Sequence, residues 1–133
     1  MSALLLDSSV WLAARDSDDR FHAAAVSLIG SGADLAALDL TLYEVCNVAT
    51  VRWRSAAEAE RLAEIVLAAT EGRFLRMDRE MAAGASAIAH AEGLTVYDAA
   101  YVACARERGW DLVSGDLLDL VSRGLAVSPD AVP

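Results

Sequence analysis

The sequence predicts an α/β fold, a three-layer α/β/α sandwich around a mostly parallel sheet of four to five strands. Short apolar runs of strand length alternate along the chain with longer segments of helical periodicity. That order favours parallel strands joined by right-handed helical crossovers, which cover both faces of the sheet. The chain has 133 residues, of which 56% are hydrophobic, enough for one buried core. We therefore expect a single domain over residues 1–133.

The strands are expected where short apolar runs end at charged or polar residues. Four segments have this pattern, and a fifth, weaker candidate lies near the C-terminus. In chain order they are 3–7, 35–39, 73–77, 111–114 and 125–127.

The helices are expected between these strands, bounded by capping residues and glycines. Ser55, followed by Glu58 three residues later, is typical of a capping box that opens a helix. Gly93 and Gly109 are placed to end helices. The expected helices are 8–15, 22–30, 41–54, 55–70, 78–92 and 96–108.

Several functional classes are excluded or disfavoured by composition. No apolar stretch approaches the roughly 18 residues of a membrane span. The first residues lack the basic segment of a signal peptide, so we expect a cytoplasmic protein. Cys46 and Cys104 lie among apolar residues without a CxxC or Cys/His cluster, which predicts core thiols rather than a zinc site or a disulfide.

The net charge is −9, and all 11 basic residues are arginines. A nucleic-acid-binding protein is normally basic, so this charge opposes a nuclease interpretation unless part of it belongs to a metal site. Among the arginines, Arg15 follows the first predicted helix and is the best candidate for an RNA phosphate contact.

Four acidic residues fall where one edge of the predicted sheet would gather them. Asp7 ends the first strand and Asp116 follows the fourth, while Glu44 and Asp98 lie near the starts of two helices. Ligands bind beyond the carboxyl ends of the strands in open α/β sheets. Because clustered carboxylates repel one another, such a group persists only if cations neutralise it, and hard oxygen ligands select Mg²⁺ or Mn²⁺.

Each of these acids also has a purely structural explanation. The segments from Thr41 to Glu44 and from Thr95 to Asp98 match or nearly match capping boxes. Asp7 is placed to cap a helix, and Asp116 follows a Ser-Gly pair typical of a turn. The metal-site prediction therefore depends on all four acids occurring together at matching positions in the topology.

Other acids are assigned outer or structural roles. Asp119 lies close enough to Asp116 to be an outer member of the site, and Asp39, at the end of the second strand, is a reserve candidate. Asp78 is expected to cap the helix that follows it.

Four segments in order, 5–10, 43–45, 97–103 and 112–116, resemble the motifs of PIN-domain nucleases, most closely the toxins of VapBC-type toxin–antitoxin pairs. The resemblance implies a Mg²⁺-dependent endoribonuclease, a homodimer and a cognate antitoxin. The acidic positions of the family fall on the four acids named above, and Ser9 and Ser114 fall where small hydroxyl residues support the site. His22 falls on a frequent non-catalytic histidine.

The sequence departs from the family pattern at two points. Ser114 stands where threonine is more usual, and Leu117 and Leu118 stand where basic or polar residues are common. A catalytically inactive PIN-fold interaction module stays as the alternative function, although all four acids are present. Trp53 is a candidate anchor for the dimer contact, with a core position as the equal alternative.

Other classes of protein are disfavoured by missing residues. Phosphoacceptor receiver domains and haloacid dehalogenases need a lysine, and the chain has none. It also has neither GxxxxGK nor GxGxxG, which disfavours nucleotide binding. A metal-free ribonuclease would need His22 and His90 to converge, although each is predicted on a different helix.

Overall fold

A four-stranded parallel sheet lies at the centre of the computed structural model, which describes residues 2–132. The strand order is β3-β2-β1-β4, and every neighbouring pair is parallel. The strands are β1 (Leu4–Leu6), β2 (Leu35–Leu38), β3 (Phe74–Leu75) and β4 (Asp111–Val113).

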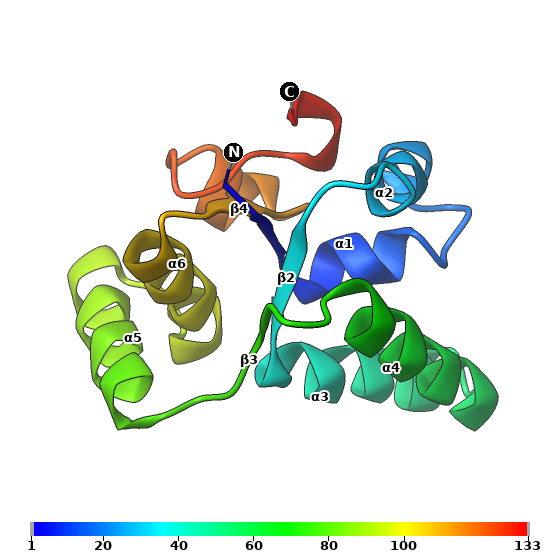
Figure 1. Cartoon of the computed structure of the whole chain (residues 1–133), viewed down its shortest axis with the longest axis horizontal. Helices are drawn as coiled ribbons and strands as arrows, with labels where there is room; N and C mark the ends of the chain where they lie inside the picture. The colour runs from blue at the N-terminus through cyan, green and yellow to red at the C-terminus, as the bar shows by residue number, and fades with distance from the viewer. Residues whose placement is uncertain (1, 133) are drawn as a thin grey trace.

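Helices cover both faces of the sheet, with α1 to α4 on one side and α5 and α6 on the other (Figure 1). The predicted three-layer α/β/α sandwich is therefore confirmed. The helical segments are α1 (Ser8–Ala13), α2 (His22–Ile29), α3 (Asp39–Asn47), η1 (Val48–Arg52), α4 (Ala56–Ala69), α5 (Arg79–Glu92), α6 (Val96–Arg108), η2 (Leu117–Val121) and η3 (Pro129–Ala131).

The strands divide their side chains between two cores because successive residues of a strand point to opposite faces. Leu6 packs into the core beneath α1 to α4, whereas Leu5 packs into the core beneath α5 and α6. Val113 and Leu112 of β4 divide between the same two cores. Burial on both faces explains why these strands are nearly continuous apolar runs.

The candidate fifth strand at 125–127 is wrong. Only Val127 meets β4, in an isolated bridge to Val113. Pro129 follows two residues later and begins η3, and its ring nitrogen has no hydrogen to donate to a strand ladder. The segment therefore touches the sheet at one point and then turns away.

The helix predicted at 41–54 begins earlier and ends differently. It starts at Asp39, directly after β2, and the final turn is the π-helical segment η1. The capping box predicted from Thr41 to Glu44 does not form, because Thr41 lies within the helix and its hydroxyl group hydrogen-bonds Tyr101 instead. Sequence spacing alone does not distinguish these two uses of a threonine.

The predicted core thiols are free cysteines, with Cys104 buried and Cys46 half-buried. Burial raises the pKa of Cys104 to about 11. Trp53 is half-buried and packs against the core beneath α1 to α4, so its use as a dimer anchor stays a prediction. Between residues 2 and 132, no helix is both long and apolar enough to cross a membrane.

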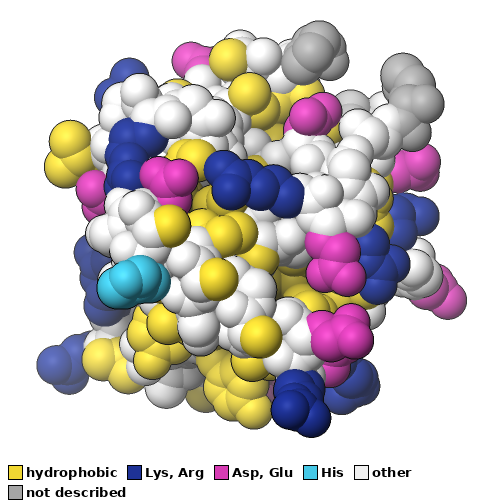
Figure 2. Space-filling view, turned by 90° about the vertical axis from the view of Figure 1, so that its left-hand side faces the viewer, with side chains coloured by type: hydrophobic (Ala, Val, Ile, Leu, Met, Phe, Trp, Pro, Cys, Tyr) yellow, Lys and Arg dark blue, Asp and Glu magenta, His cyan; other side chains and the backbone are white. Residues whose placement is uncertain are grey.

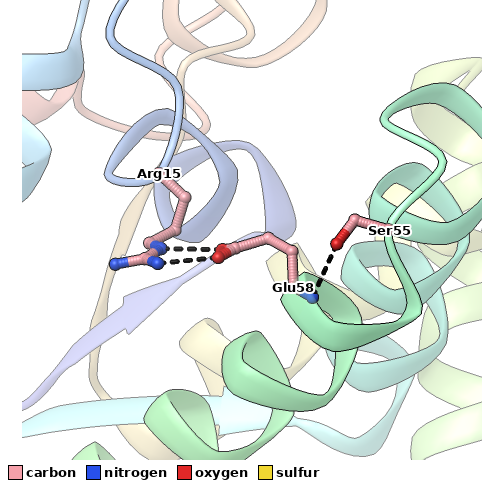
Figure 3. A network of polar contacts seen from close by, with 3 residues as sticks. All are labelled: Arg15, Ser55 and Glu58. Carbon is pink, nitrogen blue, oxygen red and sulfur yellow. Dashed lines mark hydrogen bonds and ion pairs between the residues drawn. The ribbon is translucent and has the colours of Figure 1, made fainter.

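The start of α4 forms half of the predicted capping box (Figure 3). The backbone N–H of Glu58 donates to the Ser55 hydroxyl oxygen at 3.0 Å, as the sequence predicted. The Glu58 side chain does not return to Ser55. It accepts two hydrogen bonds from the Arg15 guanidinium group, at 2.6 and 3.0 Å, and so links the end of α1 to the start of α4.

We predict that Ser55→Ala lowers the free energy of unfolding by about 1 kcal/mol, because the N–H of Glu58 loses its acceptor. Ser86, exposed in the middle of α5, provides the matched control. Ser86→Ala should leave stability unchanged or raise it by up to about 0.5 kcal/mol, because alanine is the better helix former. Urea unfolding measures both, and equal effects of the two substitutions would contradict the capping role.

Candidate metal centre

The four predicted acids all lie at the carboxyl edge of the sheet. Asp7 directly follows β1 and caps α1, and Asp116 follows the adjacent strand β4 and caps η2. Glu44 is on α3, which leaves the carboxyl end of β2, and Asp98 is in the first turn of α6. The topology therefore brings together four acids that are as much as 109 positions apart in the sequence.

Asp7 is the most buried of these acids, with 6% of its surface exposed. Loss of solvent raises the pKa of its carboxyl group to about 6, and the negative charge of Glu44 also raises it. Hydrogen bonds from Ser114 and Ser9 act in the opposite direction and lower that pKa. No cationic side chain contributes, so the carboxylate is stabilised only by neutral hydrogen-bond donors.

Ser9 connects Asp7 to the loop that follows β4. Its backbone N–H donates to Asp7 Oδ1 at 3.0 Å, and its hydroxyl group also donates to that oxygen. The same hydroxyl oxygen accepts the N–H of Gly115 at 2.8 Å. A Cβ on Gly115 would lie 3.3 Å from Ser9 Oγ and 3.4 Å from Phe21 Cδ2, so glycine permits this close approach.

Ser114 is fully buried and supports both neighbouring acids. Its hydroxyl oxygen accepts the N–H of Asp116 at 3.0 Å, and hydrogen bonding from the same group lowers the pKa of Asp7. Both predicted supporting serines therefore touch the acidic residues they were expected to support.

Glu44 accepts hydrogen bonds from the hydroxyl groups of two residues on other helices, Tyr101 on α6 and Ser8 on α1. The Tyr101 hydroxyl on α6 donates to Glu44 Oε1 at 2.6 Å, and Thr41 Oγ1 lies 2.8 Å from the same Tyr101 oxygen. Burial raises the pKa of Glu44, and hydrogen bonds from Tyr101 and Ser8 lower it. The negative charge of Asp98 raises it again.

Asp98 lies close enough to Glu44, Asp116 and Asp119 for their charges to interact. Burial raises its pKa, and the negative charges of Asp116 and Asp119 raise it further. The Thr95 hydroxyl accepts the N–H of Asp98 at 3.1 Å, so the predicted helix start at Thr95 is confirmed. Asp119 is exposed, and its N–H donates to Asp116 Oδ1 at 2.9 Å.

The chemistry of this donor set suits a hard divalent cation. Three ion pairs occur within residues 2–132, and none involves the four acids. Carboxylates that raise one another's pKa without a cationic partner are a group that a cation would stabilise.

The four acids do not form a compact set of ligands around one point. In the part of the chain that the structure describes, no three Asp, Glu, His or Cys side chains are close enough to surround one ion. The acids instead repel one another in pairs: the charge of Glu44 acts on Asp7, that of Asp98 on Glu44, and that of Asp116 on Asp98.

Three other predicted residues have structural contacts. Asp39 accepts the N–H groups of Leu40 and Met77, at 2.9 and 3.1 Å, and so joins the start of α3 to the segment after β3. His22 Nδ1 lies 2.8 Å from the carbonyl oxygen of Ala13. Asp78 caps α5 as predicted.

Arg15 is paired with Glu58 at the protein surface, which raises the pKa of Arg15 and lowers that of Glu58. Two nitrogens of its guanidinium group are thereby engaged, and its contact with RNA stays a prediction. On the face formed by α5 and α6, arginine and acidic side chains are interspersed rather than gathered by sign (Figure 2).

Sequence reasoning did not assign a role to two residues of this site. Gly115 gave no signal because its requirement arises from the approach of Ser9, which is 106 residues away. Tyr101 lies in a predicted helix one turn after Asp98, and that spacing is the only hint that it shares a face with the acid.

The sequence matches the model of the PIN domain over residues 4–117. The chain belongs to the PIN-domain family. A comparison with curated proteins found no match. Solved structures with the same fold do match this PIN domain over nearly its full length.

The crystal structure of PAE2754 from Pyrobaculum aerophilum has a TM-score of 0.72 at 27% identity, over 97% of this chain and 85% of that chain. A toxin–antitoxin complex from Klebsiella pneumoniae has a TM-score of 0.70 at 17% identity, over 96% and 98%. VapC20 of Mycobacterium tuberculosis, described as a sarcin-ricin loop cleaving toxin, has a TM-score of 0.69 at 18% identity, over 92% and 95%.

We predict that Asp7 makes this PIN domain less stable as pH rises in metal-free buffer. The folded protein holds the Asp7 proton up to a pKa of about 6, whereas the unfolded chain releases it near 3.8. The stability that this group contributes is therefore complete below pH 3.8 and is lost as pH rises to 6. The total loss is about 3 kcal/mol.

The matching measurement is urea unfolding of wild type and Asp7→Asn in EDTA at pH 4, 5, 6 and 7. The substitution should become progressively more favourable to stability between pH 4 and 6 and then level off. Added Mg²⁺ should reverse that advantage at pH 7, because the cation stabilises the ionised carboxylate. A stability difference that stayed constant with pH would contradict the burial argument.

Proposed function

We propose that this PIN domain is a metal-dependent endoribonuclease that uses Mg²⁺ or Mn²⁺ held by Asp7, Glu44, Asp98 and Asp116. The observation that carries the proposal is a set of four acids at the carboxyl edge of the sheet, with no cationic side chain paired to any of them in the described residues. A purely structural acid cluster would be expected to recruit an arginine, and the chain has 11 of them.

A bound Mg²⁺ supplies Lewis-acid stabilisation of negative charge on the phosphodiester and activates water for in-line attack. The protein contributes the orientation of the ligands. Ser9 and Ser114 fix the carboxyl group of Asp7, and the first turn of α6 presents Asp98. Asp119 is proposed as an outer member, because its charge acts on Asp98.

The net charge of −9 is partly the site itself, since the four acids contribute −4 that bound cations would offset. The RNA backbone still needs positive surface, and Arg15 is the proposed phosphate contact. Its pairing with Glu58 means that RNA would have to compete with that carboxylate.

The proposed biological role is the toxin of a toxin–antitoxin pair, acting in the cytoplasm as a homodimer and inhibited by a cognate antitoxin protein. Two things support it: the ordered VapC-like motifs, and the similarity in fold to a toxin–antitoxin complex and to an RNA-cleaving toxin. An arginine of the antitoxin, placed among the four carboxylates, would compete with the metal.

A catalytically inactive interaction module is the alternative. It is disfavoured because capping α1, the structural use of Asp7, does not require a carboxyl group that is buried without a cationic partner. Natural selection for activity would retain that destabilising group, because catalytic sites commonly hold strongly perturbed carboxylates.

We predict that Asp98→Asn abolishes RNA cleavage while the protein stays folded. Loss of a residue that only orients a ligand typically costs about 10- to 100-fold, so loss of a ligand itself should lower the rate by more than about 100-fold. The substitution keeps the side chain's shape and removes one ligand charge. Asp111→Asn is the matched control, because Asp111 starts β4 and lies at the opposite edge of the sheet. Cleavage of assorted RNAs with Mg²⁺, Mn²⁺ or EDTA measures both, and full activity of folded Asp98→Asn in EDTA would reject the proposal.

We predict that expression of the chain alone arrests growth of its host and that Asp7→Asn relieves the arrest, because the buried ligand is lost. Growth curves after induction, with immunoblots to confirm equal protein levels, measure the effect. A folded and abundant wild-type chain that left its own host unharmed would reject the toxin role and leave the nuclease proposal standing.

A further inference from the structure

The Tyr101 hydroxyl group lies between the two helices that carry Glu44 and Asp98. Tyr101 follows Asp98 by three residues on α6, and Thr41 precedes Glu44 by three residues on α3. Residues three apart share one face of a helix, so each helix presents an acid and its hydroxyl residue on the same side. The helices α3 and α6 cover opposite faces of the sheet (Figure 1). The hydrogen bonds of the Tyr101 hydroxyl therefore join the two layers.

The direction of the hydrogen bonds follows from the chemistry of the three groups. A phenol has one hydrogen, and Tyr101 donates it to Glu44 Oε1 at 2.6 Å. Thr41 must therefore be the donor in its 2.8 Å contact with the Tyr101 oxygen. The result is a directed chain from Thr41 through Tyr101 to the carboxylate.

This chain is rigid because its two hydroxyl residues are buried. Thr41 is 0% exposed and Tyr101 is 2% exposed, so packing fixes both side chains. Buried polar networks with every member satisfied hold their groups in one arrangement. Glu44 is the long member of the four acids, with one more rotatable bond than an aspartate, and it therefore depends most on a partner for its orientation.

We propose that Tyr101 is a positioning residue of the metal centre, whose hydroxyl group holds the Glu44 carboxylate in the orientation that would bind the divalent cation. This inference rests on the metal-dependent nuclease proposed above. It assigns Tyr101 no contact with RNA and no part in the chemistry. Partners that orient a ligand carboxylate typically change metal affinity by about 10- to 100-fold when they are removed.

The test is the Mn²⁺ affinity of Tyr101→Phe, measured by isothermal titration calorimetry on the full chain without RNA. We expect the dissociation constant to rise by about 10- to 100-fold. Tyr97→Phe is the matched control, because Tyr97 lies on the same helix one residue before Asp98 and is 62% exposed. The control should bind Mn²⁺ as wild type does.

A second comparison separates positioning from a general structural effect. In a Glu44→Ala background the hydroxyl has no carboxylate to orient, so Tyr101→Phe should then leave Mn²⁺ affinity unchanged. An unaltered affinity of Tyr101→Phe alone would overturn the inference. An equal loss with and without Glu44 would overturn it as well.

If circular dichroism shows that Tyr101→Phe does not fold, the Mn²⁺ affinity of Thr41→Val provides the test instead. That variant keeps the Tyr101–Glu44 bond and removes the donor behind it, so Mn²⁺ affinity should fall several-fold, and an unchanged affinity would overturn the inference. A wild type that binds no Mn²⁺ would overturn both proposals. A wild type that binds Mn²⁺ but cleaves no RNA would reject the nuclease proposal and leave this comparison valid.

Discussion

The burial of an unpaired carboxyl group at the end of β1 is the constraint on which the rest of the site depends. Asp7 lies almost out of contact with solvent, and no arginine approaches it. Ionising a buried carboxyl group is costly unless hydrogen bonds or a cation stabilise the charge. The neighbouring elements provide the hydrogen bonds, and the other acids make the site one that a cation would complete.

Two sets of hydroxyl contacts hold the acids without neutralising them. Ser9 joins the start of α1 to the loop after β4, and Gly115 allows the Ser9 side chain to approach the backbone of that loop. Tyr101 joins α6 to α3 in the same way on the other side of the site. Neutral donors fix the orientation of a carboxylate and leave its charge available to an incoming cation.

Much of the fold was predictable because its signals are local. Apolar runs, helix periodicity and capping residues such as Ser55, Asp78 and Thr95 act within a few residues of one another. The predicted local contacts that do not form belong to residues that bind a distant partner instead. Thr41 could form a capping box, but it bonds Tyr101 within the folded protein, and Glu58 likewise turns to Arg15.

The sequence by itself determined which residue types are present at each strand end, and with them the alternation of strands and helices and the four acids. Only the tertiary structure decided the environment of those acids. Loss of solvent around Asp7, the approach of Gly115 to Ser9 and the link from Tyr101 to Glu44 all join residues far apart in the chain. Such contacts depend on how helices and sheet pack, because electrostatic and hydrogen-bond energies depend on distance in space rather than on separation in sequence.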